Sequence, residues 1–324
     1  MTKSKTDKLR VGVIGVGYLG RFHAEKYAAM KGVDLVGVVD RDMSLARKIA
    51  GTLKTDAYRD YQALLGKVDA ASIVTTTPAH YRIGQDLLMH GIDVMIEKPI
   101  TETIDQAEAL IQLAGKNGRI LQVGHLERFN PAFSAAKKMV RHPVLIESSR
   151  KCSFKQRGTD VSVVLDMMIH DIDLLLSLVP SEITELKAAG MRLASGFLDV
   201  ANVHIRFAAG CVANLSASRI ASASERRMDI FQPDARIAID FTDPTVTIVR
   251  KKEAFRAESD DMVSMETRSL PKRDALQDEL AAFVRSVATR EKPEVSGEMG
   301  RNALQTALDI MAQIEGAEHS ASKG

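Results

Sequence analysis

The sequence is poor in the residues that mark secreted, metal-binding and nucleic-acid-binding proteins. It has no tryptophan, 5% aromatic residues and two cysteines, Cys152 and Cys211. Two cysteines cannot make a disulfide framework or a metal cluster, so a reduced, cytoplasmic protein is the default expectation. A nucleic-acid binder needs a basic face with interleaved aromatic side chains, and this composition argues against one.

The sequence also has no large excess of positive or negative charge and no long apolar run. The 44 lysines and arginines nearly balance 42 aspartates and glutamates, and the net charge of +2 creates no overall field toward nucleic acid or an anionic membrane. No stretch reaches the about 18 apolar residues that span a bilayer. The basic start, MTKSKTDKLR, lacks the apolar core of a signal peptide. We therefore expect no membrane partner.

The chain does contain enough apolar sequence for two domains. Its 324 residues, 45% of them hydrophobic, are typical of a globular protein with more than one core. From residue 9 to residue 124, short apolar runs alternate with amphipathic helical stretches, which predicts a doubly wound parallel sheet. The expected strands are residues 9–15, 33–40, 68–76, 91–99 and 118–124.

The pattern changes after Gly124. Period-two alternation with hairpin-length gaps predicts an open, mostly antiparallel sheet packed by helices. The expected strands are residues 143–154, 199–207, 211–220, 226–232, 235–241 and 245–252, and the helices are 130–141, 163–178, 274–290 and 299–317. The predicted fold class is therefore α/β: a Rossmann domain over residues 9–124, an α+β domain over residues 125–317, and flexible tails at residues 1–8 and 318–324.

A glycine motif follows the first strand. Gly15, Gly17 and Gly20 form G-x-G-x-x-G at the start of a helix, where they permit a tight turn, a close approach to a pyrophosphate and close packing of helix on strand. Asp40 ends the second strand twenty residues after Gly20, where a carboxylate accepts hydrogen bonds from a ribose diol. This pattern predicts NAD as cofactor, and Arg41 leaves NADP open because an arginine there can accommodate a 2′-phosphate.

Two further strand ends carry candidate residues. Thr75, Thr76 and Thr77 follow one strand, with Pro78 starting a helix and His80 in its first turn. Glu97, Lys98 and Pro99 end another strand on the same rim, the side where open parallel sheets bind ligands. For a single threonine, a well-capped helix start is an equally good explanation. The full predicted cofactor set is Gly15, Gly17, Tyr18, Leu19, Gly20, Asp40, Arg41, Thr76, Thr77, Pro78, His80, Glu97 and Lys98.

The helical stretch 163–178, VVLDMMIHDIDLLLSL, is apolar yet carries three aspartates and a histidine. At about 100° per residue, Asp166, His170 and Asp173 fall on one stripe with Ser177. Unpaired polar groups at buried positions cost several kcal/mol, so these groups need partners or a function. We interpret Asp173 as a structural partner and expect Asp171, elsewhere on the helical wheel, to be solvated or capping.

The EKP end of a strand after G-x-G-x-x-G, the TTTP rim with its histidine, and the later D-x-x-x-H helix together resemble the glucose-fructose oxidoreductase, inositol dehydrogenase and MocA (Gfo/Idh/MocA) family. The resemblance runs over nearly the whole chain. It implies that Lys98, Asp166 and His170 surround the nicotinamide and the reacting carbinol as catalytic residues. It also implies a homodimer or homotetramer assembled through the second domain's sheet.

In this interpretation, His170 removes a hydroxyl proton, Lys98 stabilises the developing alkoxide, and Asp166 orients His170 or holds a neighbouring hydroxyl. Which of Lys98 and His170 finally holds the proton is open, because the groups titrate as a coupled set. No metal is expected, since an Asp/His pair offers only two ligands.

The stretch VGHLERFNPAF, residues 123–133, joins the two domains and gives an indication of the class of substrate. Arg128 and Asn130 are predicted substrate-binding residues with Arg157, Lys98, Asp166 and His170, although Arg128 could equally bridge the domains. Arg150, Lys151, Lys155 and Arg157 add four cations that suit a diphosphate. The resemblance extends to the branch of the family that oxidises nucleotide sugars, which implies C3 of UDP-N-acetylglucosamine. The alternatives are an inositol or free-sugar dehydrogenase and, from another class, a non-catalytic NAD(P)-sensing protein.

Overall fold

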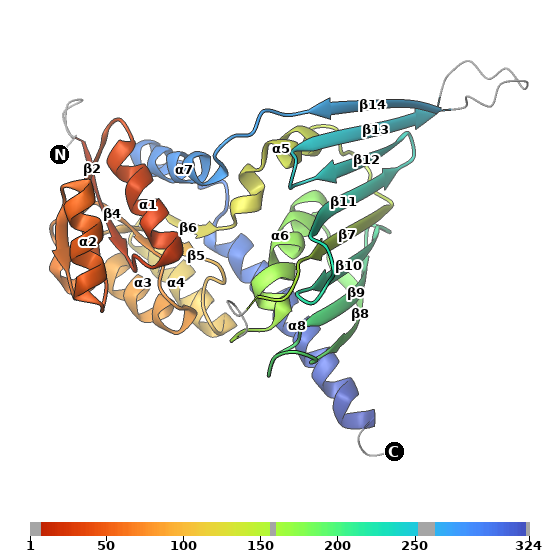
Figure 1. Cartoon of the computed structure of the whole chain (residues 1–324), viewed down its shortest axis with the longest axis horizontal. Helices are drawn as coiled ribbons and strands as arrows, with labels where there is room; N and C mark the ends of the chain where they lie inside the picture. The colour runs from red at the N-terminus through yellow and green to blue at the C-terminus, as the bar shows by residue number, and fades with distance from the viewer. Residues whose placement is uncertain (1–7, 156–159, 252–262, 322–324) are drawn as a thin grey trace, which may run out of the picture. The chain divides into compact units, whose positions relative to one another are not determined.

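The structure is a computed structural model that describes residues 8–155, 160–251 and 263–321 and divides into two compact units (Figure 1). Unit 1 contains the described residues up to Leu126 together with Asp274–Leu304, and unit 2 contains Glu127–Arg273 and the residues from Gln305 onward. The first boundary lies two residues beyond the predicted one at 124. The return of residues 274–304 to unit 1 departs from the single contiguous second domain that we expected.

Unit 1 contains a parallel six-stranded sheet in the order β3-β2-β1-β4-β5-β6. Its strands are β1 (Leu9–Ile14), β2 (Val33–Val39), β3 (Asp56–Tyr58), β4 (Ala70–Ile73), β5 (Asp93–Glu97) and β6 (Leu121–Gly124). This is the strand order of a dinucleotide-binding Rossmann fold, in which the order reverses between β1 and β4. The predicted parallel sheet is confirmed, with short β3 as an additional edge strand.

Helices connect these strands and cover the sheet (Figure 1). They are α1 (Tyr18–Ala29), α2 (Met43–Leu53), α3 (His80–Met89) and α4 (Ile104–Lys116), with short 3₁₀ turns η1 (Tyr61–Leu64) and η2 (Thr77–Ala79). Local sequence sets the helix starts: the Asp42 side chain caps α2 by accepting from the Ser44 and Leu45 amides, and Thr103 caps α4 by accepting from Gln106.

Helix α7 (Ala275–Thr289) belongs to unit 1 because its apolar stripe completes that core. Leu280 and Phe283 are fully buried, in one hydrophobic cluster with Val11 and Tyr27. Burying side chains of this size contributes about 1.5–3 kcal/mol each. An amphipathic pattern shows that a helix covers a core but not which one, so the sequence alone could not assign α7 to the first unit.

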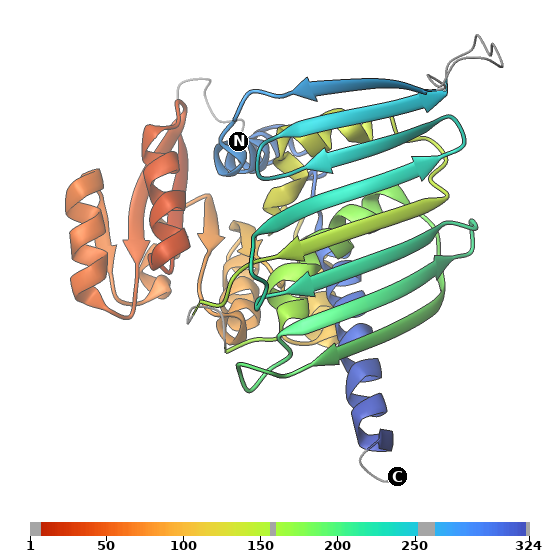
Figure 2. The same cartoon turned by 45° about the vertical axis from the view of Figure 1, so that its right-hand side comes forward.

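Unit 2 contains an eight-stranded sheet in the order β14-β13-β12-β11-β7-β10-β9-β8, antiparallel except where β7 pairs with β10 (Figure 2). The strands are β7 (Leu145–Lys151), β8 (Ile183–Met191), β9 (Val200–Phe207), β10 (Val212–Ser218), β11 (Glu225–Gln232), β12 (Ala235–Asp240), β13 (Thr245–Lys251) and β14 (Val263–Ser269). The predicted open, mostly antiparallel sheet is therefore confirmed.

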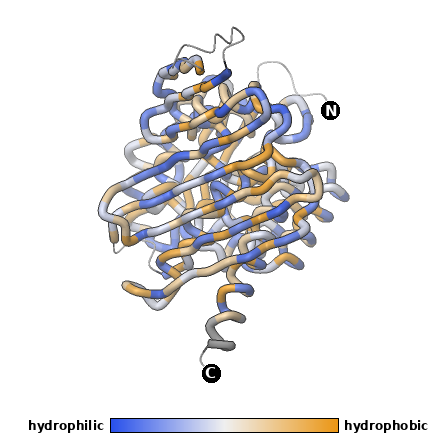
Figure 3. Tube along the Cα trace, turned by 90° about the vertical axis from the view of Figure 1, so that its right-hand side faces the viewer, coloured by the Kyte–Doolittle hydropathy of each residue, from blue (hydrophilic) through white to orange (hydrophobic). Residues whose placement is uncertain are grey.

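One face of this sheet is covered and the other is open. The turn η3 (Leu126–Phe129) leads into α5 (Pro131–Lys137), and α5 packs on the covered face with η4 (Val164–Met168) and α6 (Ile169–Leu178). Along β7, buried Ile146, Ser148 and Arg150 alternate with the more exposed Glu147 and Ser149. Figure 3 shows hydrophilic and hydrophobic residues alternating along the strands.

The strand pattern missed β8 and β14, whose sequences carry few large apolar residues; every residue of β14 is exposed. Helix α8 (Gly297–Ala321) continues through residue 321, beyond the helix end that the sequence predicted at residue 317. The segment 317–321 contains no glycine or proline to end a helix. Residues 1–7 and 322–324 of the predicted tails lie outside the described residues.

Asp199, just before β9, anchors the loop that meets the start of η4. Its Oδ2 accepts from the backbone N–H groups of Leu193 (2.8 Å), Ala194 (2.7 Å) and Ser195 (2.9 Å). The neighbouring Leu198 carbonyl accepts from the Val163 amide at 2.8 Å. Burial alone would raise the pKa of Asp199, but the Ser195 hydroxyl and these amides outweigh it and lower the pKa to about 2.

This carboxylate should make stability depend on pH. Its pKa lies below the ordinary 3.8, so its stabilisation is complete above about pH 4 and is lost as pH falls toward 2. We expect Asp199→Asn to cost about 2 kcal/mol of unfolding free energy at pH 7 and much less near pH 2. Urea unfolding at several pH values measures this. A cost that does not change with pH would contradict the assigned role.

Candidate functional site

The loop after β1 is built by glycines that leave no room for side chains. Gly15 has a φ of +85°, and a Cβ there would lie 2.6 Å from the Val74 carbonyl oxygen at the end of β4. A Cβ at Gly20 would lie 1.8 Å from the Gly15 oxygen. Gly17 is exposed and has no atom within 4 Å of the position of a Cβ. Gly15 and Gly20 therefore serve the fold, whereas Gly17 leaves open space that a ligand can occupy.

Helix α1 begins directly at this loop. Its N-cap, Gly17, provides no side-chain cap, and no acidic residue lies in the first turn to compete with a bound anion. Of the two other predicted cofactor residues here, the Tyr18 side chain is 65% exposed, while Leu19 packs against the core. The Leu19 side chain is therefore used, at least in part, in the packing of unit 1.

Asp40 is fixed beside the glycine loop. Its Oδ2 accepts from the Val16 amide at 3.0 Å and its Oδ1 accepts from the Asp42 amide at 2.9 Å. These bonds hold the carboxylate at the carboxyl end of β2, where a ribose diol is recognised in this fold. Arg41, next to it, is exposed.

The loop after β4 lies next to the glycine loop, because β1 and β4 are paired and the Val74 amide donates to the Ile14 carbonyl at 2.8 Å. Thr76 and Pro78 are exposed at this edge, and Thr77 is half-buried. His80 is buried, with Nδ1 3.0 Å from the Pro99 carbonyl oxygen and Nε2 3.1 Å from that of Thr75. Its ring therefore acts inside the fold, and any effect on a cofactor passes through the backbone that it contacts.

The end of β5 contains a histidine contact that sequence reasoning missed. Glu97 is buried; its Oε1 lies 3.1 Å from Nε2 of His23 on α1, and its Oε2 accepts from the Lys98 amide at 3.3 Å. The predicted cofactor residue Glu97 is thus occupied within unit 1, and Lys98 is half-buried. A histidine on a buried helix face was the only sequence signal for His23.

In unit 2, the helical stretch predicted at residues 163–178 starts as a π-helical turn, η4, and continues as α6. Asp166 lies in the π turn and His170 in α6, both half-buried. Four residues amount to about one helical turn, so both are positioned on neighbouring parts of one surface. Single π turns inside helices are frequent at functional sites.

The other two aspartates of this helix are structural. Asp173 is confirmed as a structural partner, because its carboxylate accepts from Arg128 Nε and, at 2.7 Å, from Arg128 Nη2. The expectation for Asp171 was wrong: it is 2% exposed and accepts two hydrogen bonds of 2.9 Å from Arg150. Helical periodicity placed Asp171 off the polar stripe but could not reveal an arginine on β7 facing it.

Several predicted substrate-binding cations and donors are also occupied. Arg128 is bound to Asp173, and Asn130 caps α5 through Ala132 while donating to the Phe241 carbonyl at 3.3 Å. We expected Arg150 to be one of the cations that bind a diphosphate. It is instead buried, hydrogen-bonded to Asp171 and, at 2.8 Å, to Glu127. Arg157 lies outside the described residues.

The described residues contain no cluster of three or more metal-ligating side chains. No helix among them combines the length and apolarity required for a transmembrane span.

A Rossmann sheet with a glycine turn at its switch point, followed by an α+β unit with an open sheet, defines an NAD-binding oxidoreductase architecture. Residues 9–125 match the oxidoreductase family with an NAD-binding Rossmann fold, and residues 137–240 match the GFO/IDH/MocA C-terminal domain. The chain belongs to the Gfo/Idh/MocA family of oxidoreductases, which confirms the resemblance found in the sequence.

Relatives match along almost the whole chain. A UDP-N-acetylglucosamine 3-dehydrogenase of Acidithiobacillus ferrooxidans is 37% identical over 308 residues, covering 95% of this chain and 97% of that protein. A solved structure of that enzyme matches with a TM-score of 0.90 at 36% identity, covering 95% of this chain and 98% of the other. A myo-inositol 2-dehydrogenase of Thermotoga maritima is 28% identical, covering 95% of this chain and 96% of its own.

Substitution of Gly17 should affect the binding of NAD without affecting the stability of the fold. We expect Gly17→Ala to leave the melting temperature within about 2 °C of the wild type, because its methyl group enters open space. The same methyl group should obstruct the approach of a pyrophosphate and weaken NAD binding about tenfold or more. Thermal unfolding and fluorescence titration with NAD measure the two effects. Gly51→Ala, also in open space but on α2, is the matched control, and equal NAD affinity in both variants would contradict the assignment.

Proposed function

We propose that this chain oxidises the C3 hydroxyl of UDP-N-acetylglucosamine with NAD as hydride acceptor. The observation that carries the proposal is the 37% identity, over 95% of the chain, with an enzyme named for that reaction. The fixed carboxylate of Asp40 supports NAD over NADP, because it can accept from a ribose diol and would repel a 2′-phosphate. When bound, the nicotinamide supplies the acceptor for the hydride that leaves carbon.

The proposed catalytic roles fall to three residues. His170 takes the proton of the substrate hydroxyl as general base, so that the alcohol becomes a ketone when its C–H hydride leaves. The Lys98 ammonium stabilises the negative charge that develops on the oxygen. Asp166, one turn from His170 on the same helix, orients the imidazole or holds an adjacent sugar hydroxyl.

The residues proposed to bind the diphosphate are fewer than the sequence suggested. The charge of Arg128 is compensated by Asp173, and Arg150 is compensated by Asp171 and Glu127. Lys151 lies 3.5 Å from Glu225. Lys155 is exposed and remains a cation proposed for the substrate. Arg157 lies outside the described residues and stays a proposal from the sequence, while Arg128 and Asn130 would shape the site through their backbone.

A cytoplasmic location is also part of the proposal. Neither Cys152 nor Cys211 is in a disulfide, which agrees with a reducing compartment. Both NAD and nucleotide sugars would then have direct access to the enzyme.

Turnover assays test the substrate and the roles together. Reduction of NAD to NADH should follow addition of UDP-N-acetylglucosamine and should be at least about tenfold slower with myo-inositol as substrate. With NADP as cofactor, formation of NADPH should be slower by a similar factor. Lys98→Ala and His170→Ala should each lower kcat by about 10²-fold or more. The exposed residues Lys116 and His90 provide matched controls, Lys116→Ala and His90→Ala, which should retain wild-type kcat.

Three results would contradict this proposal in different ways. Faster turnover of myo-inositol than of the UDP-sugar would identify the chain as a polyol dehydrogenase. NAD binding without turnover of any sugar would favour a sensing protein. If kcat of the Lys98 and His170 variants stayed within a few-fold of the wild-type value, the catalytic roles assigned to these residues would be wrong. The assignment of the substrate would not be affected.

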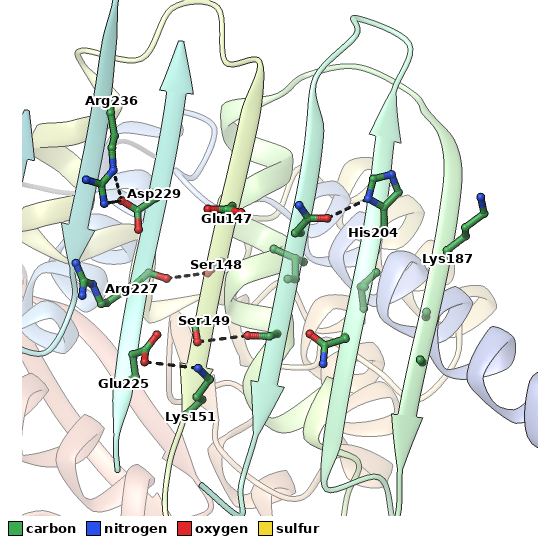
Figure 4. Close-up of a pocket in the computed structure, with 17 residues that line it drawn as sticks. Glu147, Ser148, Ser149, Lys151, Lys187, His204, Glu225, Arg227, Asp229 and Arg236 are labelled. Carbon is green, nitrogen blue, oxygen red and sulfur yellow. Dashed lines mark hydrogen bonds and ion pairs between the residues drawn. The ribbon is translucent and has the colours of Figure 1, made fainter. Parts of the chain in front are cut away.

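We further propose that the open face of the eight-stranded sheet forms a homodimer or homotetramer interface. A groove of about 770 Å³ on this face is lined by polar side chains of both charges (Figure 4). Arg236 pairs with Asp229 at 2.6 Å, and Lys151 pairs with Glu225 at 3.5 Å. A face with both charges can be self-complementary across a two-fold axis, as a homodimer requires.

Sedimentation analysis tests this assembly. Ser216 lies in the middle of the groove and donates a hydrogen bond to Ser149 at 3.3 Å. Because serine is small, the much larger side chain in Ser216→Arg should block the packing of a second sheet and yield monomers. Lys116→Glu in unit 1 should leave the mass unchanged. A wild-type monomer, or an oligomer that tolerates Ser216→Arg, would refute this interface.

A further inference from the structure

Two buried histidines contact the residues that flank Lys98 in the chain: His23 faces the Glu97 carboxylate, and His80 faces the Pro99 carbonyl. His23 on α1 and His80 on α3 are 0% and 1% exposed, so neither ring can contact solvent or a large ligand directly. Buried polar groups are normally hydrogen-bonded, and each of these rings places one nitrogen against the segment Glu97–Pro99.

The first contact fixes the residue before Lys98. His23 Nε2 lies 3.1 Å from Glu97 Oε1, and the other carboxylate oxygen of Glu97 accepts from the Lys98 amide at 3.3 Å. The imidazole thus holds a carboxylate that in turn holds the backbone of Lys98. Because His23 and Glu97 are buried, removing one of them would leave the facing polar atom of the other without this hydrogen-bond partner, at a cost of about 1–3 kcal/mol in folding free energy.

Gly124 on β6 leaves the space that this carboxylate occupies. A Cβ at position 124 would lie 2.8 Å from Oε1 and 2.9 Å from Oε2 of Glu97. The obstructing atoms belong to the end of a flexible side chain and not to the backbone. A methyl group at position 124 would therefore displace the Glu97 carboxylate from its present position without requiring the strand to move.

The second contact fixes the residue after Lys98. His80 Nδ1 lies 3.0 Å from the Pro99 oxygen and Nε2 lies 3.1 Å from the Thr75 oxygen, so the ring joins the loop after β4 to the turn after β5. Burial lowers the pKa of His80, although its hydrogen bonds to the Thr75 and Pro99 carbonyls oppose the shift. The neutral ring has one N–H, so only one of the two carbonyl oxygens accepts a hydrogen bond from it.

We propose that His23 and His80 are positioning residues that hold the Glu97-Lys98-Pro99 turn from both sides and so aim the Lys98 ammonium. This inference rests on the proposed role of Lys98 in stabilising charge on the substrate oxygen. A lysine has a long flexible side chain, so its placement depends on a fixed backbone. A displacement of about 1 Å at a catalytic group can cost about 10²-fold in rate.

The test for His23 compares removal of the donor with its replacement. His23→Leu should lower kcat about 10- to 100-fold with little change in the Kd for NAD, whereas His23→Gln, which keeps a donor near the Nε2 position, should recover most of the rate. Gly124→Ala should reproduce the loss of kcat seen in His23→Leu by displacing Glu97. His90→Leu, on the exposed end of α3, is the control for loss of a histidine.

The His80 test separates the two carbonyl contacts. His80→Asn keeps a donor near the Nδ1 position facing Pro99, and His80→Gln keeps one near the Nε2 position facing Thr75. Because the Pro99 contact holds the turn, the Asn variant should retain kcat within about threefold and the Gln variant should lose about tenfold or more. The opposite order would overturn the role of His80.

A double-mutant cycle distinguishes positioning from general stability. In a Lys98→Ala background, His23→Leu should lower kcat by less than about twofold, since the group that it positions is already gone. A full 10-fold further loss would show that His23 acts by another route and would overturn the inference. If Lys98→Ala alone left kcat unchanged, the proposed function of Lys98 would fail first, independently of the histidines.

Discussion

The contact between Gly20 and the carbonyl oxygen of Gly15 is the constraint on which unit 1 depends. A Cβ at residue 20 would lie 1.8 Å from that oxygen, so only glycine lets α1 begin against the end of β1. Gly15 in turn faces the Val74 carbonyl, which brings the loop after β4 beside the glycine loop. The pairing of β1 with β4 then places both loops at the point where the strand order reverses, which is where this fold binds dinucleotides.

Unit 2 satisfies a different constraint, the cost of placing charges in a core. Asp171 and Asp173 enter the covered side of the sheet with one arginine each, from β7 and from η3. Such buried pairs contribute little net stability, but losing one partner leaves an uncompensated charge that costs about 3–5 kcal/mol. Their effect is to fix the rotation and register of α6. The half-buried Asp166 and His170 are then held on a rigid element, the arrangement that a catalytic pair requires.

The sequence predicted the parts of the fold that depend on local pattern. Alternating strands and helices gave the parallel sheet, and period-two alternation gave most of the second sheet, because these patterns record which face of each element is buried. It failed where the answer depends on distant chain segments. Nothing in the stripe of α7 says that Leu280 and Phe283 complete the core of unit 1, and nothing local pairs Arg150 with Asp171. Similarly, His23 lies 74 residues from Glu97 in the chain.

The proposed hydride transfer from the sugar C3 carbon to the nicotinamide can be followed with an isotopic label. The enzyme would be supplied with NAD and UDP-N-acetylglucosamine carrying deuterium at C3, and the isolated NADH examined by proton NMR. The account predicts deuterium at C4 of the nicotinamide ring in one stereochemical position. NADH with only protium at C4, with the deuterium kept in the sugar or released to water, would contradict it.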